Sequence, residues 1–125
     1  HKAALLSLDG YVKAWATKDI SIFEDIFMND ETLTIYENRH IFLGWEAWKE
    51  RLEEAFPSVE QVNVLFSRSI VHVSPDGRAA WISTIEDATW LDGGEERQVS
   101  DMRVSWGMRK VGEEWKIVQA HWSIP

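Results

Sequence analysis

The C-terminal stretch, residues 101–125, constrains the fold of this chain more than any other part of it. Two runs that are rich in β-branched and aromatic residues flank a short break that contains Gly112. This arrangement predicts a β-hairpin, because a glycine-containing loop between two such runs is a strong hairpin signal. The other apolar runs must then be arranged around this C-terminal pair of antiparallel strands.

Polar side chains interrupt the predicted hairpin at regular positions. Side chains along a strand alternate between its two faces, so Arg103 and Ser105 share a face of the first strand. By the same rule Gln119, His121 and Ser123 share a face of the second strand. If both sets face the same side, they form a polar cluster at one end of an apolar sheet. That composition is typical of a ligand pocket.

Apolar spacing and turn residues predict the remaining elements. Helical spacing occurs within residues 1–17, 22–27 and 45–56, and strand patterns occur at 32–36, 40–43, 59–74, 79–91, 96–110 and 115–124. Pro-Asp-Gly at 75–77 and Asp-Gly-Gly at 92–94 supply turns between the long strands. Helices followed by a run of strands predict an α+β fold, with the helices packed on one face of an antiparallel sheet.

Both faces of the predicted C-terminal strands carry apolar residues. Met102, Val104 and Trp106 share one face of their strand, and Trp122 lies on the last strand. A sheet that is apolar on both faces is covered on both. We therefore expect helices on one face and a second copy of the chain on the other, in a homodimer whose contact includes these four residues.

Length and composition exclude several classes of function. The 125 residues fit one domain that spans residues 1–125. A net charge of -8 argues against nucleic-acid binding, and no apolar run reaches the roughly 18 residues of a membrane span. The chain has no cysteine, and its four histidines lack the spacing of metal ligands. We expect no metal, no cofactor and a cytoplasmic location.

The C-terminal residues also resemble the signature of a protein family. The matching pattern is Arg103-Val104-Ser105, Gly112, Trp115-Lys116-Ile117-Val118, His121, Ser123 and Pro125. It is similar to the ending of SnoaL-like proteins, which belong to the superfamily of nuclear transport factor 2 and ketosteroid isomerase. The association domain of calcium/calmodulin-dependent kinase II is similar too. The resemblance implies a cone-shaped curved sheet with three N-terminal helices that enclose a pocket, but this fold hosts many functions.

Four polar residues are the first candidates for chemistry. The resemblance implies that Arg103 lies in the pocket, where it could hold a carboxylate or phenolate oxygen, although it could also form a structural ion pair. Glu86 and Asp87 are adjacent on a strand, so one of them should point inward and either pair with Arg103 or act as a base. His121 could be a general base, a ligand contact or a structural residue.

Further candidates come from the comparison with ketosteroid isomerase, which uses an acidic base together with a tyrosine and a protonated acid as hydrogen-bond donors. Glu37 could match the base and Tyr11 the tyrosine, whereas no second buried acid is evident in the sequence. Several other residues are candidates for ligand contacts in the pocket wall: Tyr36, Trp15, Trp48, Trp90 and Ser123.

Three functions are compatible with these residues. The first is a domain that binds a small organic molecule, including carboxylates, in an aromatic pocket near Arg103. The second is a cofactor-free isomerase, cyclase or dehydratase that uses Glu86, Asp87, Glu37 or His121 for proton transfer. The third is an oligomerisation module. Binding ranks above catalysis. A general base needs a pKa near the working pH, and an Arg103–Glu86 pair would lower the pKa of the Glu86 carboxyl.

Overall fold

The structure, a computed structural model, describes residues 2–125, and its described elements are three helices and six strands. The helices are α1 (Lys2–Thr17), α2 (Ile20–Ile26) and α3 (Trp45–Ala55). The strands are β1 (Thr34–Glu37), β2 (His40–Leu43), β3 (Val59–Val73), β4 (Ala79–Asp92), β5 (Glu95–Val111) and β6 (Glu114–Ser123). The expected α+β architecture is confirmed, with boundaries that differ by a few residues. His1 lies outside the described residues.

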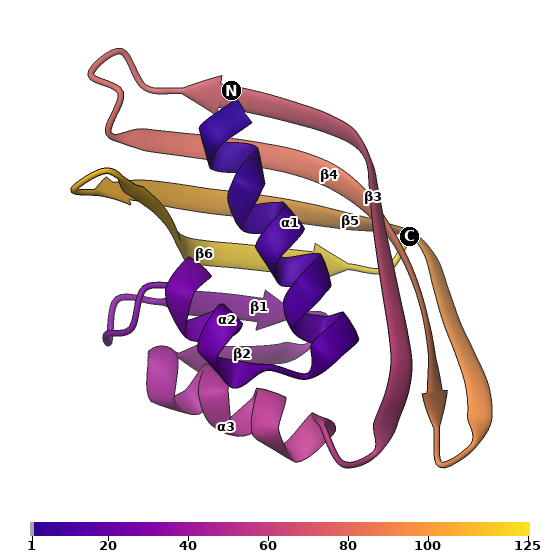
Figure 1. The fold of residues 1–125 in the computed structure, drawn as a ribbon. Coiled ribbons are helices and arrows are strands. Elements are labelled where there is room, and N and C mark those ends of the chain that lie inside the picture. The colour runs from indigo at the N-terminus through magenta and orange to yellow at the C-terminus, as the bar shows by residue number, and fades with distance from the viewer. Residues whose placement is uncertain (1) are drawn as a thin grey trace.

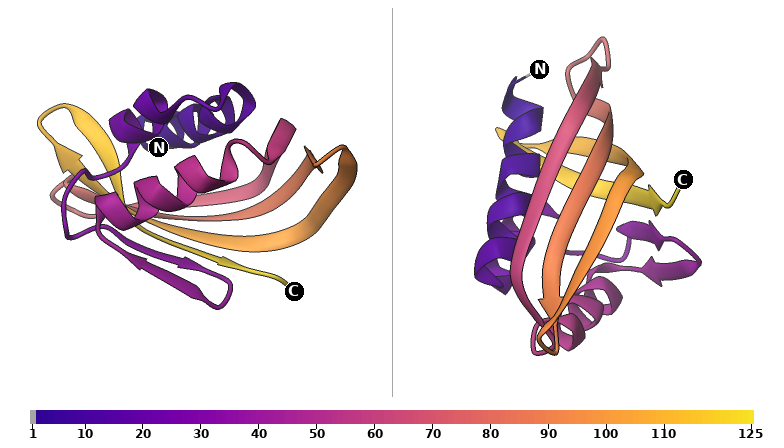
Figure 2. Two further views of the ribbon diagram at one scale, coloured as in Figure 1. Left: turned by 90° about the horizontal axis from the view of Figure 1, so that it is seen from below. Right: turned by 90° about the vertical axis from the view of Figure 1, so that its right-hand side faces the viewer.

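One curved sheet contains the six strands in the order β2-β1-β6-β5-β4-β3. Neighbouring strands are antiparallel except for β1 and β6, which run parallel. The long strands bend around the helices, which all lie on the concave side of the sheet (Figures 1 and 2). None of the helices described here is long and apolar enough to cross a membrane.

Irregular pairing gives the sheet its curvature. Register shifts interrupt the β3–β4 ladder twice and the β4–β5 ladder once. One residue at each of these places, Gln61, Arg68 and Asp101, has a positive φ of 51–55°. An extra residue in one strand bends that strand and increases its twist. The concave face that receives the helices therefore depends on these three irregularities.

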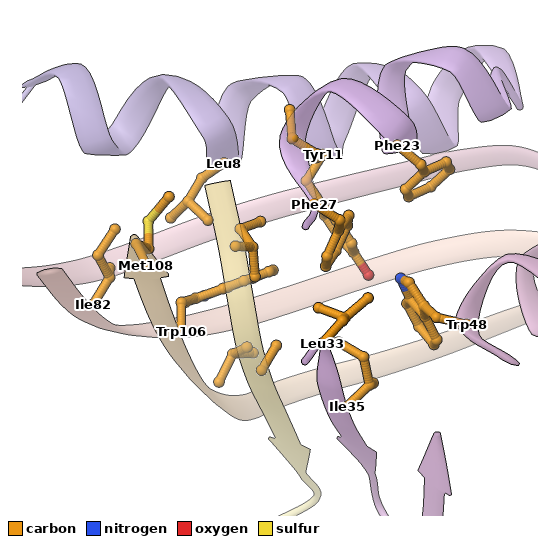
Figure 3. Close-up of a cluster of buried hydrophobic side chains, with 14 of the residues drawn as sticks. Leu8, Tyr11, Phe23, Phe27, Leu33, Ile35, Trp48, Ile82, Trp106 and Met108 are labelled. Atoms are coloured by element: carbon orange, nitrogen blue, oxygen red, sulfur yellow. The ribbon is translucent and has the colours of Figure 1, made fainter. Parts of the chain in front are cut away.

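The residues expected to form a dimer contact face the helices instead. Met102, Val104, Trp106 and Trp122 are all buried in the core, with at most 8% of their surface exposed. Figure 3 shows Trp106 beneath Tyr11 of α1. The expected contact was wrong, because this apolar face of β5 and β6 is the concave face that the chain's own helices cover.

A further irregularity determines which residues of β6 face inward. Gly107 pairs with Gln119 and Met108 pairs with Ile117, so Val118 is an extra residue in β6. Ile117 and Ala120 are consequently both 0% exposed. Strict alternation would have placed these two side chains on opposite faces.

Candidate functional site

A cavity of about 680 Å³ lies between the concave face of the sheet and the helices α1 and α3. This volume falls within the usual range of small-molecule pockets. Aromatic side chains from both layers line it: Tyr11 and Trp15 of α1, Trp90 of β4 and Trp122 of β6. The sheet adds the apolar side chains of Val62, Val64, Ala88, Val99 and Met102. The cavity is therefore suited to a largely apolar ligand.

Strand β4 places a buried carboxyl group on this apolar wall. Glu86 is 4% exposed and lines the cavity. Its neighbours in register on the adjacent strands are Phe66 and Met102. The Trp122 indole N–H donates to Glu86 Oε1 at 3.1 Å. None of the ion pairs among the described residues involves Glu86.

The surroundings of Glu86 favour its neutral form. Burial raises the pKa of Glu86 from 4.5 to about 7; the hydrogen bond from Trp122 opposes this rise, and the negative charges of Glu37 and Asp87 add to it. Desolvation penalises the charged form of a carboxyl group, and here no paired cation offsets the penalty. Glu86 can thus both give up and accept a proton near neutral pH.

Helix α1 brings a phenol to the same cavity. Leu8, Tyr11 and Trp15 follow helical spacing, and Tyr11 is 4% exposed. Burial raises the pKa of Tyr11 well above its ordinary value of 10.0; the charge of Glu86 adds to the rise, and a hydrogen bond from Trp15 opposes it. The Tyr11 hydroxyl therefore stays protonated and can donate a hydrogen bond to a ligand.

An ion pair lies at the edge of the cavity. Arg51 of α3 donates from Nε to Glu37 Oε1 at 3.1 Å, and its Nη2 lies 3.1 Å from the same oxygen. Glu37 ends β1, so the pair ties α3 to the sheet. Because the pair holds the Arg51 guanidinium against Glu37, Glu86 keeps its apolar surroundings.

The charges around the cavity are mainly negative. Four carboxyl groups line it, those of Glu37, Glu54, Glu86 and Asp92. Arg51 is the one Arg or Lys among the described lining residues, and it is already paired with Glu37. Like charges repel more strongly in a site of low dielectric constant. The cavity is therefore unfavourable for an anionic ligand.

The predicted polar cluster forms on the opposite, outer face of the sheet. Arg103 pairs in register with Ser123, Ser105 with His121 and Tyr36 with His121. The rings of Tyr36 and His121 meet edge to face at 5.8 Å. The expected pocket position of Arg103, Tyr36, His121 and Ser123 was wrong, because the larger apolar set of β5 occupies the inner face.

Two more candidates lie away from the cavity. Asp87 points away from it, and its Oδ1 accepts the backbone N–H of Asp101 at 2.9 Å, within the irregular part of the β4–β5 pair. The expected pairing of Arg103 with Glu86 does not occur, because the two side chains are on opposite faces. Trp48 is fully buried behind Trp122, on which its ring stacks at 5.9 Å.

The structure thus brings together Glu37, Glu86, Trp15 and Trp90 of the predicted residues. Sequence reasoning missed Arg51, and it named Tyr11 only as a possible match to the tyrosine of ketosteroid isomerase. The spacing of Leu8, Tyr11 and Trp15 was a usable signal for Tyr11, since it puts the phenol on the apolar side of α1. For Arg51 no such signal exists.

Comparisons with known proteins agree with this fold. Residues 6–125 match the SnoaL-like domain. A nuclear transport factor 2-like superfamily protein from Salmonella enterica serovar Typhimurium superposes with a TM-score of 0.85 at 18% identity, covering 95% of this chain and 86% of that one. A provisionally assigned scytalone dehydratase from Novosphingobium aromaticivorans gives a TM-score of 0.89 at 13% identity, with coverages of 99% and 83%.

A third similar structure is a provisionally assigned calcium/calmodulin-dependent protein kinase II association domain from Xanthomonas campestris. Its TM-score is 0.82 at 18% identity, and the match covers 99% of this chain and 86% of that one. A search of curated proteins found no match. At these identities the structural likeness shows the fold alone.

Proposed function

The chain belongs to the SnoaL-like domain family, and we propose that it is a cofactor-free enzyme that moves a proton next to the carbonyl group of a small, uncharged ligand. The observation that carries this proposal is the position of Glu86, a buried carboxyl on the wall of an aromatic cavity, which has no paired cation among the described residues. The reaction class is that of an isomerase, cyclase or dehydratase.

The shared step of these reactions is the formation of an enolate. In the proposed step, the Glu86 carboxylate removes a proton from the carbon beside the carbonyl. The electron pair of that C–H bond forms a C=C bond, and the π pair of the C=O bond moves onto the carbonyl oxygen. Glu86 then returns the proton to another carbon, or a β-hydroxyl group leaves as water with that proton. A general base works best when its pKa lies near the working pH, and the pKa of about 7 fits this need.

Tyr11 is the proposed partner of the carbonyl oxygen. Tyr11 lines the same cavity, its hydroxyl stays protonated, and the charge of Glu86 reaches it. A donor fixed in a desolvated site stabilises the negative charge that develops on such an oxygen. Glu86 and Tyr11 would therefore act on neighbouring atoms of one ligand.

Ketosteroid isomerase offers a related assignment, in which a tyrosine and a neutral acid are both donors and another acid is the base. Here Glu37 would be the base and protonated Glu86 the second donor. The pH profile separates the two assignments. Activity that rises through pH 7 assigns the base to Glu86, and activity that falls there assigns it to Glu37.

The activity can be tested before the natural substrate is known. 2-Tetralone, an uncharged fused-ring ketone, exchanges its α-protons with D₂O, and NMR follows the exchange. We expect the protein to accelerate this exchange and Glu86→Gln to reduce the acceleration by about 100-fold or more, as for loss of a general base. Glu96→Gln, an exposed change on β5, serves as the matched control. Exchange that is equally fast in Glu86→Gln contradicts the proposal.

Binding without catalysis is the second candidate, because the aromatic cavity supports it by itself. In that case 2-tetralone binds with no accelerated exchange in either protein. The third reading, an oligomerisation module, stays a prediction, since the likeness to the association-domain structure shows the fold alone. A cytoplasmic location stays a prediction.

We also propose that the chain forms a homodimer through the outer face of its sheet. Exposed apolar side chains remain there, including Ile41, Leu43 and Trp81, at 62%, 68% and 52% exposure. Trp81 stacks on His72 at 5.6 Å. Replacing Trp81 with Arg should convert the dimer to a monomer in sedimentation velocity without loss of folding. A wild-type monomer, or a Trp81→Arg variant that remains dimeric, contradicts this contact.

A further inference from the structure

A buried N–H group lies unpaired in the layer behind the cavity. Trp48 of α3 is 0% exposed, and its Nε1 is the buried side-chain nitrogen that lacks a hydrogen-bond partner among the described residues. An unsatisfied buried donor costs about 1–3 kcal/mol. Buried polar groups without partners are rare enough that each needs an explanation.

The packing around Trp48 fixes the direction of this N–H. Its ring lies against Phe27, Phe42 and Trp122, with centroid distances of 6.1, 5.6 and 5.9 Å. Trp122 is the residue whose own N–H donates to Glu86. The Trp48 ring therefore packs against the Trp122 indole, which donates to Glu86. The Trp48 N–H takes no part in that hydrogen bond.

The group that this N–H faces is the phenol of the cavity. Figure 3 shows the Tyr11 hydroxyl oxygen and the Trp48 ring nitrogen directed toward one another. The Trp15 indole already interacts with that oxygen. A hydroxyl oxygen has two lone pairs in addition to its proton, so it can accept a second hydrogen bond and still donate its own proton.

We propose that Trp48 is a positioning residue for Tyr11: its N–H donates to the Tyr11 oxygen when the Tyr11 proton engages a ligand oxygen in the cavity. The inference deepens the proposed function, since it rests on Tyr11 as a donor. Hydrogen bonds in a chain strengthen one another, and those of an empty site often tighten only when a ligand binds. The Trp48 N–H, which has no partner among the described residues, is then available to donate to Tyr11.

The first test observes the Trp48 N–H directly, with 2-naphthol as the probe and the indole ¹H–¹⁵N NMR spectrum as the readout. Saturating 2-naphthol should move the Trp48 indole proton downfield in the wild type. Tyr11→Phe keeps the ring and removes the oxygen, so the same addition should leave that proton in place. If saturating 2-naphthol leaves the Trp48 indole proton of the wild type in place, the proposal is overturned. An equal movement in Tyr11→Phe overturns it as well.

The second test removes the N–H without changing the shape of the ring. Site-specific replacement of Trp48 by 3-benzothienylalanine exchanges the N–H for sulfur, and 2-naphthol should then bind about 3- to 10-fold more weakly. The matched control is the same replacement at Trp106, whose N–H donates to Thr84 Oγ1 at 3.1 Å, and it should leave the affinity unchanged. Equal affinity in the Trp48 variant overturns the proposal.

These readouts are independent of turnover. If the Trp48 proton moves as expected but no Glu86-dependent exchange of 2-tetralone occurs, the positioning role stands and the proposed enzyme activity fails. If the exchange of 2-tetralone depends on Glu86 but the Trp48 indole proton moves equally in the wild type and in Tyr11→Phe, the enzyme proposal stands and the role of Trp48 is refuted.

Discussion

A buried carboxyl group without a paired cation destabilises its own folded state when it ionises. Among the described residues Glu86 is the one carboxyl that the fold buries. The aromatic and apolar side chains that make the cavity a ligand site are thus the same ones that make Glu86 costly to ionise. Residues that serve a reaction often reduce stability in this way.

This cost gives a pH dependence of stability with a definite sign. The folded-state pKa of Glu86 is raised to about 7 from 4.5, so between these values the folded protein binds more protons than the unfolded chain. Stability contributed by Glu86 is complete below about pH 4.5 and is lost as the pH rises through 7. The full shift corresponds to about 3 kcal/mol.

Urea unfolding of the wild type and Glu86→Gln at a series of pH values measures this loss. We expect the wild type to lose about 3 kcal/mol relative to Glu86→Gln between pH 4.5 and pH 9. Glu96→Gln should run parallel to the wild type throughout. A constant difference between the wild type and Glu86→Gln would mean that Glu86 ionises freely in the folded protein.

At the scale of elements, one extra residue in β6 decides which groups reach the core. Val118 shifts the register so that Ile117, Ala120 and Trp122 are all buried. A one-residue change of register moves every later side chain of a strand to the other face. The hydrogen bond from Trp122 to Glu86 therefore depends on the irregularity at Val118.

Deleting Val118 tests whether it is the extra residue. The shortened strand alternates regularly, with Ile117, Ala120 and Trp122 at every second position, so all three side chains stay on the inner face. We therefore expect the near-UV circular dichroism of the packed indoles to be retained, with a loss of stability of at most about 1–3 kcal/mol. A deletion variant that loses this spectrum and about 3–5 kcal/mol, comparable to truncation of a buried Trp, would show that Trp122 has left the core and would contradict the assignment of Val118.

The elements themselves were largely predictable from the sequence. Turn residues such as Gly77 and Gly93, both with positive φ, separate long apolar runs, so the boundaries of β3, β4 and β5 follow from local chemistry. The parallel pairing of β1 with β6 was not predictable, since it joins segments about 85 residues apart and depends on how the whole sheet assembles.

The site was less predictable, because alternation defines two faces of a strand but does not say which one is concave. Arg103 and Met102 alternate as expected, yet the polar set was expected in the pocket and the apolar set at an interface. Glu86 and Asp87 could not be separated either, since the irregular pairing that lets Asp87 bind the Asp101 backbone is a property of two strands.

At the scale of the whole molecule, the charge pattern determines what the cavity accepts. The net charge is -8, and four carboxyl groups line the cavity, with Arg51 already paired. Arg103, expected to attract a carboxylate, lies on the far side of the sheet. The revised expectation is a preference for uncharged ligands.

A pair of probes that share one naphthalene ring tests this preference. At pH 8, 2-naphthol is uncharged and 2-naphthoate carries one negative charge, and quenching of Trp fluorescence reports both. We expect 2-naphthoate to bind about tenfold more weakly or worse, a difference of at least ~1.4 kcal/mol. Arg103→Met should bind both probes as the wild type does. Tighter binding of 2-naphthoate would restore an anion site.

Glu86 is a desolvated acid that faces the cavity and has no cation partner among the described residues, and titration of its side-chain carboxyl tests this assignment. ¹³C NMR of the free protein, with Glu86→Gln used to assign the resonance, follows that titration. The structure predicts a midpoint near pH 7, well above the ordinary 4.5. A midpoint at or below 4.5 would show that Glu86 is solvated or paired, and the proposed base would be lost.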